Sequence, residues 1–185
     1  MGDSLLAVDL GAGRTARAIT AGDNQTCAIL DNESIKCWGS NASGQLGQGD
    51  TNNRGDVSGE MGDSLTAVDL GNERTAKAIA AGNQHTCAIL DNSSIKCWGA
   101  NASGQLGLGD TNNRGDGSAS GGMGDSLPAV ELGSGAKAIA AGNQHTCAIL
   151  DNSSVKCWGA NASGQLGLGD DDNRGDNSSE MGDYL

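Results

Sequence analysis

The 185-residue chain carries 23 acidic and 11 basic residues, a formal net charge of −12 at pH 7. Phosphate binding depends on Lys and Arg, so this balance argues against a nucleic-acid partner; no stretch has the apolar length of a membrane span, which argues against membrane insertion. Glycine supplies 31 residues and phenylalanine none, which predicts many turns and a core of Ala, Ile, Leu and Val around one Trp per repeated unit.

A unit that occurs three times dominates the sequence. Residues 76–110 recur at 136–170 with a single change, Ile95 to Val155, and residues 16–50 are a more divergent copy. Length changes fall only between copies, at 117–122 and 133–135. Self-similarity at this period is typical of solenoids, propellers and arrays, whose units pack on their neighbours. The predicted repeats are 1–60, 61–122 and 123–180, and 181–185 begins a further one.

Each unit contains four short apolar runs separated by Gly, Asn and Asp clusters. In the second unit they are, in chain order, Ser64–Leu70, Lys77–Ala81, Thr86–Leu90 and Ile95–Trp98. No segment holds the apolar stripe of a helix, so an all-β chain is expected. The runs predict a four-stranded antiparallel sheet in every unit. The inward-facing residues of the first run are predicted to be Leu65, Val68 and Leu70.

The six cysteines form three pairs with the same spacing. In the second unit, a three-residue turn at Asp91–Ser93 with Ser93 left-handed would place Cys87 opposite Cys97. Directly opposed residues in antiparallel strands lie within disulfide range. In the chain-entropy model each bridge contributes about 3 kcal/mol. The predicted cross-strand disulfides are Cys27–Cys37, Cys87–Cys97 and Cys147–Cys157.

Paired and repeated cysteines indicate an oxidising compartment. Their spacing is neither that of zinc knuckles nor that of thioredoxin-like redox sites. We therefore expect a protein that is secreted or held at the extracellular surface. Residues Met1–Leu5 repeat the phrase at Met61–Leu65 and contain no signal segment, so a secreted form would be a mature piece of a longer chain.

Residues 80–109, AAGNQHTCAILDNSSIKCWGANASGQLGLG, closely resemble the regulator-of-chromosome-condensation repeat. The matching elements are Ala-Gly, His-Thr, an apolar strand, Trp-Gly-x-Asn and Gly-Gln-Leu-Gly-x-Gly. The resemblance implies four-stranded propeller blades, set in rings of typically seven. Some family members are nucleotide-exchange factors for a small nuclear GTPase and also bind chromatin. Three units fall short of such a ring, so we expect tandem blades that are open or completed by other chains.

Three Asn-x-Ser sequons fall at the tip of the predicted hairpin, where a glycan would point into water. Asn is also a natural turn residue at this place, so a plain turn is the alternative. The candidate glycosylation sites are Asn32, Asn92 and Asn152. For the Asn of Trp-Gly-x-Asn, the resemblance instead implies a loop-bonding role, at Asn41, Asn101 and Asn161.

Each unit also contains one Arg-Gly-Asp triplet, which resembles the integrin-recognition motif. A turn with a local Arg–Asp contact is the favoured interpretation, because repeat duplication makes the three copies one observation. The candidate adhesion residues are Arg54, Gly55, Asp56, Arg114, Gly115, Asp116, Arg174, Gly175 and Asp176.

The loop before each triplet is acidic and rich in amides, as calcium loops are. The pattern stops short, because Arg stands at a would-be ligand position and no bidentate Glu follows. An ordinary solvated turn without a cofactor is favoured over calcium. The calcium alternative would use Asp50, Asn52, Asp110, Asn112, Asp170 and Asp172.

No Ser-His-Asp set, catalytic Cys/His pair, P-loop or paired carboxylate recurs, and His85 and His145 are interpreted as structural, so no enzymatic activity is expected. The favoured function is an extracellular structural protein that self-associates head-to-tail into a filament, sheath or larger array. One alternative is an extracellular adhesion module that binds a protein partner through the Arg-Gly-Asp turns. Another is an intracellular propeller resembling guanine-nucleotide-exchange factors.

Overall fold

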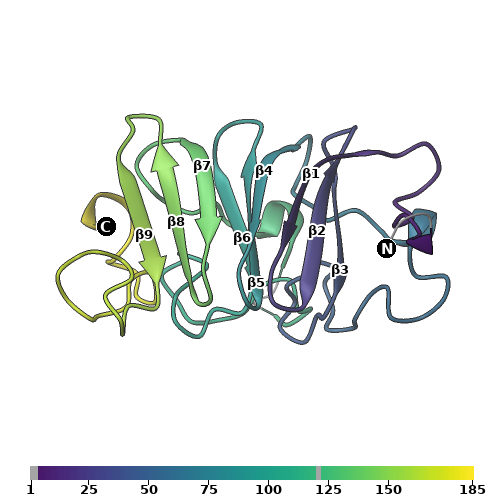
Figure 1. Ribbon diagram of the computed structural model, residues 1–185. Helices are drawn as coiled ribbons and strands as arrows, with labels where there is room; N and C mark the ends of the chain where they lie inside the picture. The colour runs from purple at the N-terminus through teal and green to yellow at the C-terminus, as the bar shows by residue number, and fades with distance from the viewer. Residues whose placement is uncertain (1–3, 120–121) are drawn as a thin grey trace.

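The computed structural model describes residues 4–119 and 122–185. Residues 1–3 of the first predicted repeat and 120–121 of the inserted tract lie outside this description. The chain forms three antiparallel sheets, which stand side by side with the two termini at opposite ends (Figure 1). No helix in the described ranges is long and apolar enough to cross a membrane. The strands are β1 (Ala16–Ala21), β2 (Gln25–Leu30), β3 (Ile35–Gly39), β4 (Ala76–Ala81), β5 (His85–Leu90), β6 (Ile95–Gly99), β7 (Ala136–Ala141), β8 (His145–Leu150) and β9 (Val155–Gly159).

We call the sheets β1–β3, β4–β6 and β7–β9, each with the loop that follows it, blades 1, 2 and 3. The all-β propeller class is confirmed, but each sheet has three strands rather than the four expected. The run Ser64–Leu70 follows from a 3-10 helix, η2 (Gly62–Ser64), and meets β3 where the Val68 N–H donates to the Ile35 carbonyl at 2.8 Å. Similar turns stand at η3 (Gly124–Ser126) and η4 (Gly182–Tyr184).

Uneven apolar spacing explains the missing strand. A strand alternates its side chains between two faces, whereas Leu65, Val68 and Leu70 are spaced three and then two residues apart and are all buried. The backbone of this run therefore does not keep the alternation of a strand, and all three side chains are buried.

The hairpin of blade 2 forms as predicted. Ser93 has a left-handed φ of 67°, and the Leu90 N–H donates to the Ser94 carbonyl at 2.9 Å. This turn sets Cys87 opposite Cys97 and joins them in a disulfide, with the Cα atoms 4.1 Å apart. Blades 1 and 3 repeat the bridge with Cys27–Cys37 and Cys147–Cys157.

The core lies between the blades. One face of blade 1, which carries Ile29 and Ile35, packs against Val68, Leu70 and Trp98 of the second unit. The corresponding face of blade 2 packs in the same way on the third unit, through Cys87, Ile89, Ile95, Cys97, Leu106, Val130, Leu132, Leu150 and Trp158. Each blade thus buries its apolar surface against a neighbour, as expected for a repeat protein.

In blades 1 and 2, a buried lysine links the segment before the sheet to the segment after it. The Nζ atom of Lys96 donates to the main-chain oxygens of Leu70 at 2.9 Å and Gly124 at 2.8 Å. Lys36 binds Leu10 and Gly62 in the same manner. Burial lowers the pKa of Lys96, and the nearby carboxylates of Asp125 and Asp69 oppose this shift.

The Ala-Gly turns mark the closest approach of neighbouring blades. A Cβ atom added to Gly22 would lie 2.1 Å from the carbonyl oxygen of Gly82, and one added to Gly82 would lie 2.4 Å from that of Gly142. Both distances are far below van der Waals contact, so these positions require glycine.

Candidate interaction surfaces

A main-chain carbonyl organises the junction between blades. The carbonyl of Gln45, in the Gly-Gln-Leu-Gly loop of blade 1, accepts hydrogen bonds from Trp98 Nε1 at 3.0 Å and Thr86 Oγ1 at 2.9 Å. At the junction of blades 2 and 3, the Gln105 carbonyl accepts from Trp158 Nε1 and Thr146 Oγ1, both at 3.0 Å. One acceptor on the earlier blade and two donors on the later one therefore define a polar contact that occurs twice.

Blade 3 leaves its outer face uncovered. Ile149 is 43% exposed and Val155 is 63% exposed, whereas their blade 2 equivalents, Ile89 and Ile95, are 2% and 1% exposed. The open face carries an apolar groove of about 120 Å³. Gln165, the equivalent of Gln45 and Gln105, is also exposed. We call this the C-terminal face and define it by Ile149, Val155, Gln165 and Leu168.

The first unit, which comprises blade 1 and the segment before β1, exposes the side chains that correspond to the other half of a blade junction. Val8 is 53% exposed against 5% for its equivalent Val68, and Trp38 is half-buried whereas Trp98 is fully buried. Ile19 is 69% exposed. We call this the N-terminal face and define it by Val8, Leu10, Ile19, Thr26 and Trp38. Together, the two end faces present side chains equivalent to those that meet at the two junctions between blades.

A buried histidine adds a polar link between blades 2 and 3. His85 Nε2 lies 3.0 Å from Thr146 Oγ1, and the Nδ1 atom of His85 is buried without a hydrogen-bond partner. Burial, followed by the charge of His145, lowers the pKa of His85 to about 4. A neutral imidazole with one paired nitrogen is a packing group, in agreement with its sequence interpretation.

The Arg-Gly-Asp triplets turn their arginines inward. The Arg54 guanidinium donates to Asp50 Oδ2 at 2.6 Å and to the Asn52 carbonyl at 2.9 Å. Arg114 is only 8% exposed and makes the same contacts with its own loop. The local Arg–Asp contact therefore exists, but it reaches back to the Asp before the triplet. An adhesion role stays a prediction, and it would require these arginines to leave their loops.

The acidic loops use their carboxylates internally. Asp110 binds the Arg114 guanidinium at 2.7 Å and accepts from the Asn112 N–H at 2.8 Å. Partial burial raises the pKa of Asp110, but these hydrogen bonds outweigh it and bring the pKa below its usual range. In the described ranges, no three His, Cys, Asp or Glu side chains are grouped to hold a metal ion.

The two classes of asparagine occupy different surroundings. Asn92 is exposed at the hairpin tip, where its Oδ1 accepts from the Ser94 N–H at 3.1 Å and the Ser94 hydroxyl at 2.8 Å. Asn32 and Asn152 make the same contacts. Asn101 is fully buried, and its Nδ2 donates to the Asp110 carbonyl at 2.7 Å. Glycosylation stays a prediction, and the hairpin asparagines have the accessibility it needs.

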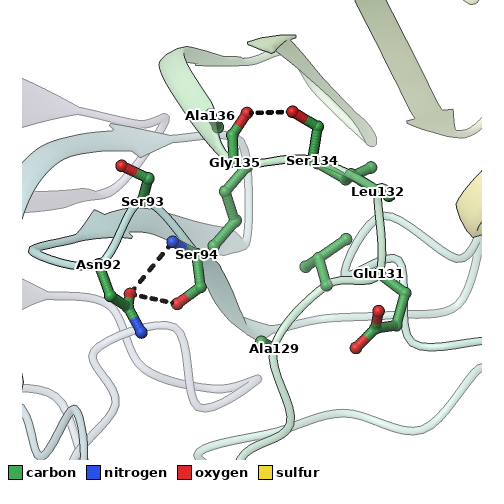
Figure 2. Close-up of a pocket in the computed structure, with 12 residues that line it drawn as sticks. Asn92, Ser93, Ser94, Ala129, Glu131, Leu132, Ser134, Gly135 and Ala136 are labelled. Atoms are coloured by element: carbon green, nitrogen blue, oxygen red, sulfur yellow. Dashed lines mark hydrogen bonds between the residues drawn. The ribbon is translucent and has the colours of Figure 1, made fainter. Parts of the chain in front are cut away.

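A hollow of about 380 Å³ lies between this hairpin tip and the link into blade 3 (Figure 2). In the preceding junction, Arg74 pairs with Asp91 at 3.3 Å and Thr75 donates to Glu33 at 2.9 Å. The link Gly133–Gly135 is two residues shorter than that segment and has no such side chains. The hollow lies beside this shorter link, and its one ionisable lining residue is Glu131.

Comparison with known protein families shows that the three units are copies of one repeat type. Models of the "Regulator of chromosome condensation (RCC1) repeat" match residues 16–45, 76–105 and 136–165 in one register, and 37–89 and 97–149 in another. The second register covers more than half of the chain and runs from one blade into the next. The chain belongs to the RCC1 repeat family. It is therefore an RCC1-repeat propeller domain, and the sequence resemblance is confirmed.

RCC1-repeat relatives are considerably longer than this chain. The ultraviolet-B receptor UVR8 of Arabidopsis thaliana is 27% identical over 206 residues, covering 85% of this chain and 44% of UVR8. The X-linked retinitis pigmentosa GTPase regulator of Mus musculus is 29% identical, covering 84% and 14%. The structure of Prp20p from Saccharomyces cerevisiae superposes with a TM-score of 0.66 at 21% identity, covering 86% and 37%. This chain thus spans less than half of each.

Sequence reasoning missed the Gln carbonyls and the buried lysines. The carbonyl acceptor at Gln45 is a main-chain atom, so its residue type carries no signal. Lys36, Lys96 and Lys156 did offer one, since each stands between apolar residues of a strand in every copy. A charge kept at the same place in an apolar strand indicates a buried partner, because an unpaired buried charge is costly.

Proposed function

We propose that this RCC1-repeat chain is a non-enzymatic structural protein of an extracellular compartment, which assembles head-to-tail into a filament, sheath or larger array. One observation carries the proposal: the end faces expose the residues whose equivalents are buried between blades. Val155 at one end and Val8 at the other are both more than half exposed, whereas their equivalents Ile95 and Val68 are buried. Apolar patches of this kind mark interaction surfaces in soluble proteins.

The three disulfides support the extracellular part of the proposal. Each closes a hairpin with a sequence separation of 10 residues, and no described cysteine is free. Such bridges persist in oxidising compartments and are rare where thiols are kept reduced. An intracellular exchange-factor-like role would instead require the thiols to be reduced.

The hollow between the hairpin tip of blade 2 and the link into blade 3 is consistent with a role without catalysis. It is lined mainly by main-chain groups and small side chains, with the single carboxylate of Glu131. General acid–base and nucleophilic chemistry both need at least two cooperating groups within hydrogen-bond reach. The hollow therefore suits a spacer between repeats better than an active site.

Sedimentation velocity over a dilution series, together with negative-stain imaging, tests the assembly. We expect the average mass to rise with protein concentration and the particles to be rings or filaments of blade width. A species with the mass of one chain at every concentration would contradict the proposal. Intact-mass analysis without reductant tests the compartment, with all six cysteines expected as disulfides.

A further inference from the structure

We propose that the partner of the C-terminal face is the N-terminal face of a second copy of this chain, and that Trp38 and Thr26 of that copy donate to the main-chain carbonyl of Gln165. This inference rests on the proposed function. It adds the head-to-tail direction of the assembly and names the side chains that form the contact between chains. It predicts a junction between chains that copies the two junctions within the chain.

The polar part of this contact has the geometry observed inside the chain. Trp Nε1 and Thr Oγ1 of one blade meet the Gln carbonyl of the preceding blade at 2.9–3.0 Å in both junctions. Trp38 and Thr26 stand at the matching positions of blade 1, and both are half-buried there. Gln165 stands at the matching position of blade 3 and is exposed, whereas Gln45 and Gln105 are 1% and 2% exposed.

The apolar part is complementary in the same way. Within the chain, Ile29 and Ile35 of blade 1 pack against Val68, Leu70 and Trp98. The C-terminal face offers their equivalents as Ile149 and Val155. The N-terminal face offers Val8, Leu10 and Trp38 in place of the second set. Blade 3 thus lacks only the group of side chains that blade 1 of another copy presents.

A histidine extends the match. His85 of blade 2 bonds to the hydroxyl of Thr146 on blade 3. The equivalent of His85 in blade 3 is His145, which is half-buried at the open end. Thr26 of the second copy is the equivalent of Thr146, so the proposed junction gives His145 the same partner.

Hydrogen-bond chemistry favours one polarity. Two C-terminal faces would bring together two Gln165 carbonyls, which are both acceptors. Two N-terminal faces would bring together the donors of Trp38 and Thr26 without a carbonyl to receive them. Buried groups left unpaired destabilise an interface, so a heterologous head-to-tail contact is favoured over a symmetric dimer.

The polarity is tested with one blocked face at a time. Ile19→Lys blocks the N-terminal face and Val155→Lys blocks the C-terminal face, and both side chains are already exposed. Lysine also reduces the net charge, so added repulsion cannot explain a loss of binding. Ala102→Lys is the matched control, because this position is exposed in the middle blade. We expect each blocked variant to be monomeric, their equimolar mixture to form dimers that do not grow, and the control to assemble normally.

The hydrogen bonds are tested with Trp38→Phe combined with Thr26→Val. Losing two donors should raise the dissociation constant about tenfold to a hundredfold. Trp98→Phe removes the same indole donor inside the chain, so it should lower the unfolding midpoint and leave the dissociation constant unchanged. Sedimentation equilibrium gives the dissociation constants of the double variant and of Trp98→Phe, and circular dichroism checks that both variants fold.

Each outcome bears on a definite claim. Dimers of either blocked variant alone, or an unchanged dissociation constant for the double variant, would overturn the proposed contact and leave self-assembly standing. A wild-type chain that stays monomeric at all concentrations would overturn both. Blocked variants that associate only when mixed would establish the head-to-tail polarity.

Discussion

His85 Nε2 lies 3.0 Å from the hydroxyl of Thr146, across the junction of blades 2 and 3. That hydroxyl donates to the Gln105 carbonyl at 3.0 Å, so it must accept from His85, which places the imidazole proton on Nε2. The Nδ1 atom faces a buried site without a partner. Protonation of Nδ1 would create a second donor there with nothing to receive it.

The first prediction concerns pH. The pKa of His85 is about 4 in the folded chain, and it returns to about 6.5 on unfolding. The unfolded state then binds more protons between these values, so the free energy of unfolding falls as pH decreases through this window. The loss is about 3 kcal/mol by linkage. His85→Gln, which copies Gln25 of blade 1, should remove this loss. Urea unfolding between pH 4 and 7 measures the free energy of unfolding of both proteins. The same pH dependence in the two proteins would show that His85 is not the group responsible.

The second prediction concerns the disulfides. Replacing Cys87 and Cys97 together by alanine should lower the free energy of unfolding by about 3 kcal/mol, because the unfolded hairpin regains its loop entropy. Replacing Cys147 and Cys157 gives a matched comparison, since both loops have a sequence separation of 10 residues. Denaturant unfolding gives both values. Free thiols in the native chain, or bridges between blades, would contradict the pairing.

The third prediction concerns Lys96, which is 8% exposed. Lys96→Met should lower the free energy of unfolding by about 2–3 kcal/mol, because the carbonyls of Leu70 and Gly124 lose a charged donor. Lys77→Met is the control, since Lys77 is exposed. Thermal and urea unfolding measure both variants. An equal effect of the two substitutions would show that the buried lysine has no special role.

The fourth prediction concerns glycans. When the chain is expressed through a eukaryotic secretory pathway, peptide mapping should find sugar at Asn32, Asn92 and Asn152. Asn101 should be unmodified, because its Nδ2 is buried and donates to the Asp110 carbonyl. Asn92→Gln should remove one glycan and leave the unfolding midpoint nearly unchanged, since the side chain is exposed. Sugar found only at buried asparagines such as Asn101 would contradict this prediction.

Local chemistry was readable from the sequence. The turn at Ser93 depends on neighbours in the chain, and it alone sets the register that joins Cys87 to Cys97. The strands end at Gly, Asn and Asp clusters, so their bounds differ from the prediction by one residue at each end at most.

Contacts between blades were less predictable. The run Ser64–Leu70 has the composition of a strand, but Val68 and Leu70 pack on blade 1 and the run forms no strand. The acceptor role of Gln45 involves a main-chain atom and arises only when a second blade is present. The local Arg–Asp contact was predicted from the sequence, and the structure identifies the partner of Arg54 as Asp50. The first two features depend on how the units pack, which a single unit does not encode, whereas the Arg54–Asp50 pair is local to one loop.

The repeated Trp–Gln junction makes whole blades interchangeable. Deleting residues 71–132 would join Leu70 to Gly133 and set Trp158 above the Gln45 carbonyl, where the indole would find the same acceptor that it has at Gln105. Such a two-blade chain should fold without a new contact. In-frame recombination between copies could therefore lengthen or shorten this protein by whole blades, and selection could adjust its reach while leaving its internal chemistry unchanged.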